Sequence, residues 1–132
     1  MHAPEVSAPD PAGRRAVTGI HVIADLYGCQ ALDEMTNGER LERTCVEYVR
    51  EAGLFDVGRM FHQFPGEGGV TGTVVLAESH MALHTWPEHG YVSLDVFVCN
   101  YSSDNTAKAR NLASRLIALF QPEDARVQEV NR

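Results

Sequence analysis

The sequence predicts one α/β domain of the α+β type: a two-layer sandwich whose mostly antiparallel sheet has its helices packed on one face. Three observations predict this class. The chain has 132 residues, enough for one hydrophobic core. Two segments show helical periodicity, and the remaining apolar residues fall in extended runs separated by glycine and proline. Residues 1–15 hold three prolines and few apolar groups, so we expect a flexible arm there and a single domain over residues 16–132.

The order of the elements follows from local patterns. Aliphatic and β-branched residues predict strands, and apolar residues at helical spacing predict a helix over residues 39–52, which Gly53 ends. A second helix has an apolar stripe from Ala107 to Leu119, with Ser103 or Asp104 as its cap and Pro122 beyond its end. The expected strands are residues 17–26, 57–64, 72–78 running on into 80–86, 91–99 and, less strongly marked, 126–130.

The two faces of the central strands differ in chemistry. Because side chains alternate along a strand, residues 91–99 place four aliphatic side chains on one face and a mixed set on the other. The aliphatic face is expected to be core. The mixed face predicts contact with solvent, a subunit interface or a site, and it comprises Tyr91, Ser93, Asp95, Phe97 and Cys99, with His80, Ala82, His84 and Trp86 on the preceding strand.

Composition excludes several partners. The formal charge is −7, from 11 basic and 18 acidic residues, which disfavours nucleic acid and favours a cationic small molecule. No apolar run approaches the ~20 residues that span a bilayer, and no secretory signal begins the chain, so we expect no membrane partner and a cytoplasmic location. The three cysteines form no CxxC pair. Cys45 lies on the first helix's apolar stripe and is expected in the core, and Cys29 remains unassigned.

Residues 78–99 concentrate groups that can move protons or act as nucleophiles. A metal site made by His80 and His84 is not expected, because residues four apart on a strand lie ~13 Å apart, so the predicted metal is none. Cys99 activated by His84 on a neighbouring strand is a conceivable nucleophile. The alternative is that a half-buried sheet face simply collects satisfied polar residues, and the pattern alone leaves both open.

The run AESHMALHTWPEHGYVSLDVFVCN, residues 77–100, resembles the central motif of the prokaryotic S-adenosylmethionine decarboxylase proenzymes. Residues 19–29, GIHVIADLYGC, resemble the opening strand of that pyruvoyl-dependent family, and FHQF with GVTGTVVL, within residues 61–76, resembles the strands before its cleavage site. The resemblance implies decarboxylation of S-adenosylmethionine in polyamine biosynthesis. A pyruvoyl-dependent L-ornithine or L-arginine decarboxylase and a non-processing binding or regulatory homologue are the alternatives.

The resemblance also implies how the active group is made. The proenzyme is expected to cut itself between Glu78 and Ser79 into a β chain of residues 1–78 and an α chain of residues 79–132. Ser79 becomes a covalent pyruvoyl group, the only cofactor expected, whose carbonyl forms a Schiff base with the amino-acid-type substrate. His84 matches the family's processing histidine, and Cys99 matches the acid that protonates the product carbon.

Other positions carry over as substrate contacts. Glu88 matches the carboxylate that holds the ribose hydroxyls, Phe64 matches the ring that stacks on adenine, and Thr71 stands where the family usually has a serine that supports processing. The loop at residues 65–69 departs from the family pattern, and its Glu67 is a candidate partner for a cationic substrate group. Together with His89 and Asn100, which also depart from it, this loop bears on substrate choice. The family resemblance implies a homodimer of processed αβ protomers.

Overall fold

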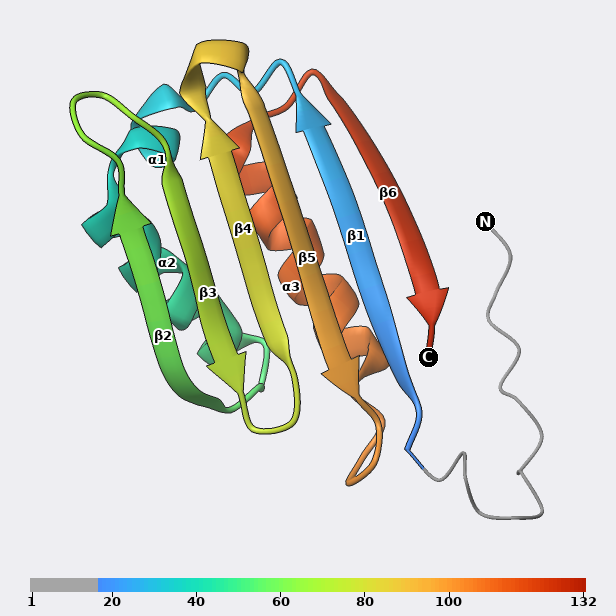
Figure 1. Cartoon of the computed structure of the whole chain (residues 1–132). Helices are drawn as coiled ribbons and strands as arrows, with labels where there is room; N and C mark the ends of the chain where they lie inside the picture. The colour runs from blue at the N-terminus through green and yellow to red at the C-terminus, as the bar shows by residue number, and fades with distance from the viewer. Residues whose placement is uncertain (1–16) are drawn as a thin grey trace.

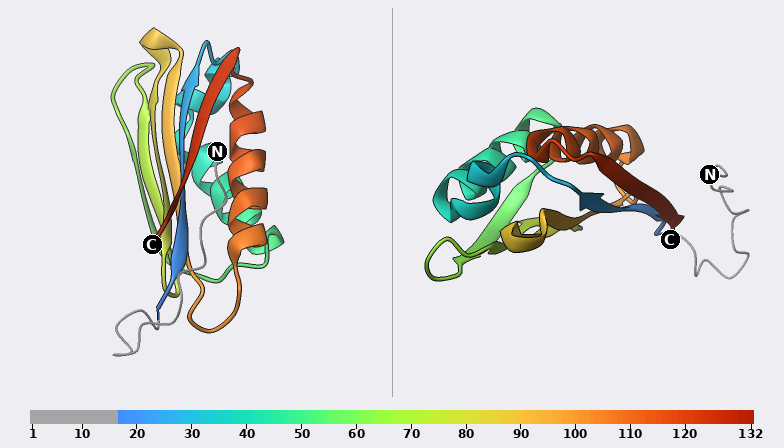
Figure 2. Two further views of the ribbon diagram at one scale, coloured as in Figure 1. Left: turned by 90° about the vertical axis from the view of Figure 1, so that its right-hand side faces the viewer. Right: turned by 90° about the horizontal axis from the view of Figure 1, so that it is seen from above.

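The structure, a computed structural model, describes residues 17–132. One six-stranded sheet has the order β2-β3-β4-β5-β1-β6, and every neighbouring pair is antiparallel (Figure 1). The helices cover one face of this sheet (Figure 2), as predicted. The elements are β1 Gly19–Tyr27, α1 Leu32–Thr36, α2 Gly38–Glu51, β2 Asp56–Gln63, β3 Val70–Leu76, β4 His80–Trp86, a 3-10 turn Pro87–His89, β5 Tyr91–Cys99, α3 Thr106–Phe120 and β6 Asp124–Asn131.

The core lies between the sheet and the helices. The aliphatic face of β5 is buried as its alternation predicted, and its side chains pack with those of α2 and α3. Cys45 is fully buried on α2, which confirms its expected place in the core. That burial raises the pKa of the Cys45 thiol to about 12, so Cys45 stays a neutral packing group at physiological pH.

The expected run from residues 72–78 into 80–86 is two strands, and the prediction of one continuous segment was wrong. A tight turn joins β3 to β4 with Ala77 and Glu78 at its tip. The N–H of Leu76 donates to the carbonyl of Ser79 at 2.9 Å, and the N–H of Ser79 donates back at 3.4 Å. The chain reverses here because these paired backbone groups close the hairpin without glycine or proline.

Smaller differences concern the ends of elements. The N-cap of α3 is Asn105 and not the expected Ser103 or Asp104, although the Asp104 carboxylate still accepts from the N–H of Thr106 at 3.0 Å. Helix α1 was not predicted, because its five residues bury only Met35 and give no periodic signal. Strand β6 extends the weakly marked segment at both ends.

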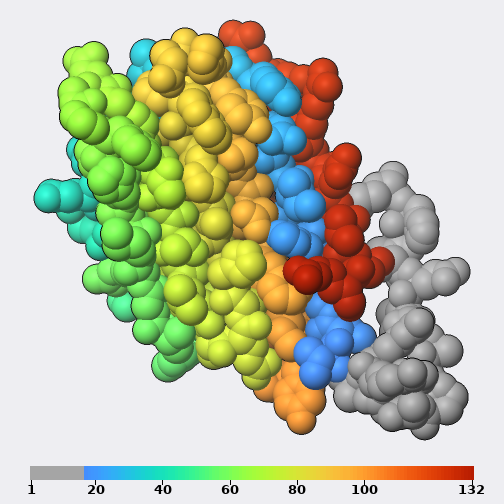
Figure 3. Space-filling view, viewed as in Figure 1, coloured from blue at the N-terminus to red at the C-terminus, as the bar shows by residue number. Residues whose placement is uncertain are grey.

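Among the described residues, no helix covers the second face of the sheet, which Figure 3 shows toward the viewer. The mixed side chains of β4 and β5 lie on this uncovered face, together with alternate residues of β1, β3 and β6. Within residues 17–132, none of the helices is long and apolar enough to cross a membrane. The expected arm at residues 1–15 lies outside the described residues.

Candidate functional site

Ser79 lies at the base of the hairpin between β3 and β4. It is half-buried, whereas Glu78 at the tip is exposed, and the Ser102 hydroxyl donates to the Glu78 carboxylate at 2.8 Å. The peptide bond between Glu78 and Ser79 lies in the turn between the ends of β3 and β4, and its N–H donates to the Leu76 carbonyl at 3.4 Å. A cut at this position would open the turn and leave β3 and β4 uncut.

Cys99 lies at the same end of the sheet. It is the last residue of β5, and the register pairs His80, the residue after Ser79, with Phe97 two positions before Cys99. The Cys99 side chain is a free, buried thiol. Its carbonyl accepts from the Asn105 amide at 2.9 Å, which ties the end of β5 to the start of α3. The buried Cys99 thiol thus lies at the same end of the sheet as the β3–β4 hairpin.

His84 and Thr71 form a pair on the uncovered face. They are directly opposite one another on β4 and β3, and the Thr71 hydroxyl lies 3.1 Å from His84 Nδ1. His84 is exposed and Thr71 half-buried. The hydrogen bond engages Nδ1 and orients the imidazole ring, whose second nitrogen can accept or donate a proton.

Thr71 and His84 line a pocket of about 390 Å³. Phe64 contributes an aromatic ring that is 47% exposed, and Glu88 contributes a carboxylate from the 3-10 turn. The structure thus brings together four predicted site residues from separate segments. The full lining is Phe64, Gly68, Gly69, Thr71, His84, Thr85, Trp86 and Glu88.

The loop between β2 and β3 forms one wall of the pocket. The Gln63 amide donates to the carbonyl of Gly68 at 2.9 Å, and its oxygen accepts from the N–H of Gly38 at 2.7 Å, so one side chain fixes the loop to α2. A side chain at Gly69 would place its Cβ 2.0 Å from the Thr85 carbonyl oxygen. Glu67 is exposed and is not among the lining residues, so the described pocket does not include it.

Trp86 is a lining residue that the sequence analysis did not select. Its ring centroid lies 6.0 Å from that of His84 and 5.1 Å from that of Tyr91, and Tyr91 in turn stacks on Tyr27. The signal was available, because Trp86 shares the His84 face of β4 by simple alternation. A hydrogen bond to Asp25 holds the Tyr91 hydroxyl and, with burial, raises its pKa to about 12.

The predicted residues fall into two groups at opposite ends of the sheet. Ser79 and Cys99 are at one end, and His84 with its pocket is at the other. Ser79 and His84 are separated by five positions on an extended chain, about 16 Å at strand spacing. Proton transfer needs a heavy-atom distance of about 3 Å. One chain therefore does not bring its own His84 to its own Ser79.

Comparison with known proteins places this chain in a family. The S-adenosylmethionine decarboxylase family model matches residues 20–132. An S-adenosylmethionine decarboxylase proenzyme of Archaeoglobus fulgidus is 39% identical over 88% of this chain and 98% of its own. One from Carboxydothermus hydrogenoformans is 46% identical over 77% of this chain and 79% of its own.

A solved structure agrees with these sequence matches. The crystal structure of the adenosylmethionine decarboxylase from Aquifex aeolicus superposes with a TM-score of 0.75 at 33% identity, covering 86% of this chain and 89% of that one. Fold, sequence and length of match agree, and the expected resemblance is confirmed. The chain belongs to the S-adenosylmethionine decarboxylase family.

Proposed function

We propose that this chain is a self-cleaving, pyruvoyl-dependent enzyme that decarboxylates S-adenosylmethionine in cytoplasmic polyamine biosynthesis. The observation that carries the proposal is the pocket in which Phe64, Thr71, His84 and Glu88 converge from separate segments. An aromatic ring beside a carboxylate suits an adenosyl group, since the ring can stack on adenine and the carboxylate can accept from ribose hydroxyls. The names of the relatives support the same substrate.

The position of Ser79 fits the formation of a pyruvoyl group. In the proposed cleavage the Ser79 hydroxyl attacks the Glu78 carbonyl carbon, the C–N bond breaks, and an ester to Ser79 forms. Elimination then releases the Glu78 carboxylate, and hydrolysis of the remaining imine leaves a ketone and ammonia. The Glu78–Ser79 bond lies in the exposed turn between β3 and β4, where Ser79 is paired with Leu76 and Glu78 lies outside both strands, so the rearrangement would take place in the turn and not within a strand. The pyruvoyl carbonyl supplies the electron sink for decarboxylation.

The remaining roles belong to side chains. His84, oriented by the Thr71 hydroxyl, moves the proton during elimination. Cys99 donates the proton that replaces the departing carbon dioxide, and it is poised to do so as a buried thiol at the Ser79 end of the sheet. Glu67, exposed at the tip of the loop, is proposed only as an outer contact for a cationic substrate group.

Two copies of the chain complete the site. Ser79 and Cys99 lie at one end of the uncovered face, and Thr71, His84 and the pocket at the other. A twofold axis that places two such faces against each other brings the Ser79 end of one protomer to the His84 end of its partner, twice. The mixed polar and aromatic chemistry of that face supports this assembly, because the aromatic row of Trp86 and Tyr91 offers area for burial.

The test combines mass and turnover. Purified chain should convert from one species of 132 residues into fragments of residues 1–78 and 79–132, and it should release carbon dioxide from S-adenosylmethionine in preference to ornithine and arginine assayed in parallel. Ser79→Ala should abolish cleavage. Cys99→Ala should still cleave but lose about 10²–10⁴-fold in turnover. Cys29→Ala, which removes another buried thiol, is the matched control.

Three outcomes would contradict the proposal. A chain that remains intact after prolonged incubation would contradict the proposed self-cleavage. Preferential release from ornithine or arginine removes the substrate assignment. Equal turnover in the Cys99 and Cys29 variants removes the assignment of the proton donor.

A further inference from the structure

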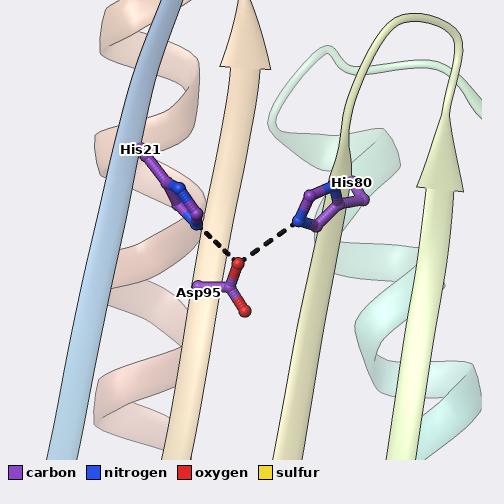
Figure 4. A group of neighbouring side chains, drawn as sticks. All are labelled: His21, His80 and Asp95. Carbon is purple, nitrogen blue, oxygen red and sulfur yellow. Dashed lines mark hydrogen bonds and ion pairs between the residues drawn. The ribbon is translucent and has the colours of Figure 1, made fainter. Parts of the chain in front are cut away.

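Three ionisable side chains converge at a point on the uncovered face. His21 extends from β1, His80 from β4 and Asp95 from the strand between them, β5 (Figure 4). His21 Nε2 lies 2.6 Å from Asp95 Oδ2, and His80 Nε2 lies 3.3 Å from the same oxygen. One carboxylate oxygen thus lies between two imidazole nitrogens that come from the strands on either side.

This convergence follows from strand order. β1 and β4 both pair with β5, and the register places His21 and His80 opposite the same residue, Phe97. The Phe97 ring contacts both imidazoles, at centroid distances of 5.6 and 5.8 Å, and holds them on either side of Asp95. The arrangement is therefore built into the sheet and does not depend on a mobile loop.

The donor atoms suit a transition-metal ion. One ligand atom from each residue can be chosen so that all lie within 4.8 Å of one another. Tetrahedral ligands at zinc distances are about 3.3 Å apart, so the His80 to Asp95 spacing already fits and the His21 to Asp95 spacing has to open by less than 1 Å. Two imidazoles and one carboxylate are also a ligand set that zinc accepts while leaving one position open.

In the single chain the cluster is open enough for an ion to enter, and in the dimer proposed above it would lie between the two facing sheets. The side chains of His21, Asp95 and His80 are 20%, 29% and 41% exposed. The chain's formal charge of −7 favours a cation at its surface. We propose that His21, His80 and Asp95 form a binding site for one divalent cation of the zinc class.

The site shares the uncovered face with the proposed decarboxylation machinery, and His80 directly follows Ser79, but it uses none of the same side chains. The sequence analysis considered His80 only with His84, four positions along the same strand, and rejected that pair as a metal site. The structure instead pairs His80 with residues of two other strands. Cation binding needs neither a cut at Glu78–Ser79 nor S-adenosylmethionine, so it can be measured in protein that does neither.

The experiment titrates metal into chelator-stripped, full-length protein. Isothermal titration with zinc chloride is carried out on the wild type and on Ser79→Ala, and cobalt absorption reports the coordination of the bound ion. We expect one ion per chain in both proteins and a rise in melting temperature with zinc. His21→Ala and Asp95→Asn should each weaken binding by at least tenfold. His89→Ala, which removes an exposed histidine outside the cluster, is the control for zinc binding.

The variants at β1 and β5 decide the result, because His80 adjoins Ser79. Circular dichroism confirms that they fold, and size-exclusion chromatography confirms that they assemble as the wild type does. Absence of saturable zinc binding would overturn the proposal. So would binding that persists in both His21→Ala and Asp95→Asn, or magnesium binding as tight as zinc, since imidazole is a poor ligand for magnesium. Zinc binding without self-cleavage would leave this site intact and remove the proposed function.

Discussion

A mixture of two inactive variants should regain activity if each site is built from two protomers. Ser79→Ala lacks the group that is converted, and His84→Ala lacks the group that moves the proton, so neither homodimer has a working site. In a mixed dimer one site combines both lesions, and the other combines intact Ser79 and Cys99 from one chain with intact Thr71 and His84 from its partner. The separation of about 16 Å along β4 is what requires this exchange.

The expected magnitude follows from counting. Random pairing of equal amounts makes half of the dimers mixed, and each mixed dimer has one working site of two, so roughly a quarter of wild-type activity returns. The same fraction of chains should be cleaved, all of them His84→Ala chains. The assay refolds the two denatured variants together and measures intact mass and carbon dioxide release.

A second mixture is the control for this prediction. Ser79 and Cys99 are at the same end of the sheet, so mixing Ser79→Ala with Cys99→Ala assembles no intact site and should show no more turnover than Cys99→Ala alone. Turnover in that control mixture above that of Cys99→Ala alone would refute the assignment of the two ends. Failure of the Ser79 and His84 mixture to cleave, in dimers that chromatography shows to be mixed, would refute the two-protomer site.

Two further predictions concern stability. Gly69→Ala forces a Cβ against the Thr85 carbonyl, so it should lower the free energy of unfolding in urea by about 1–3 kcal/mol and weaken substrate binding, whereas Gly58→Ala, with open space around it, should stay within ~0.5 kcal/mol of wild type. Hydrogen bonds from Arg50 lower the pKa of Asp56, so the ionised carboxylate stabilises the fold above its ordinary pKa and this contribution is lost as the pH falls through the lowered value. Wild type should therefore lose its advantage over Asp56→Asn in urea titrations as the pH falls from about 4, the ordinary pKa of the carboxyl, through its lowered pKa, and a constant difference would contradict this reasoning.

Strands that are buried on one face could be predicted closely from the sequence. Residues 91–99 were assigned with the bounds that β5 has, because strict alternation there reflects a core on one side and an uncovered face on the other. The sequence of helix α1 showed no such pattern, because only one of its five residues, Met35, is buried. The hairpin at Ala77 and Glu78 was missed because backbone pairing closes it without the usual turn residues.

The candidate site was only partly accessible to sequence reasoning. The roles of Ser79 and His84 were predicted from the family resemblance. Their separation to opposite ends of the sheet became evident only from the structure, in which β4 is a continuous strand between them. The pair of His21 and Asp95 joins residues 74 positions apart, and it exists only because β1 inserts beside β5. Alternation predicts the face on which a side chain lies, but it does not predict which strand is its neighbour.

The order of the strands bears on what a cut at Glu78–Ser79 would leave behind. The first fragment would contain β1, β2 and β3, and the second would contain β4, β5 and β6. In the sheet, β1 is inserted between β5 and β6, while β3 remains paired with β4 (Figure 1). The two fragments thus pair with each other at three places in the sheet, β3 with β4, β5 with β1 and β1 with β6, and could come apart only by unfolding, so a nicked molecule should behave as one cooperative unit.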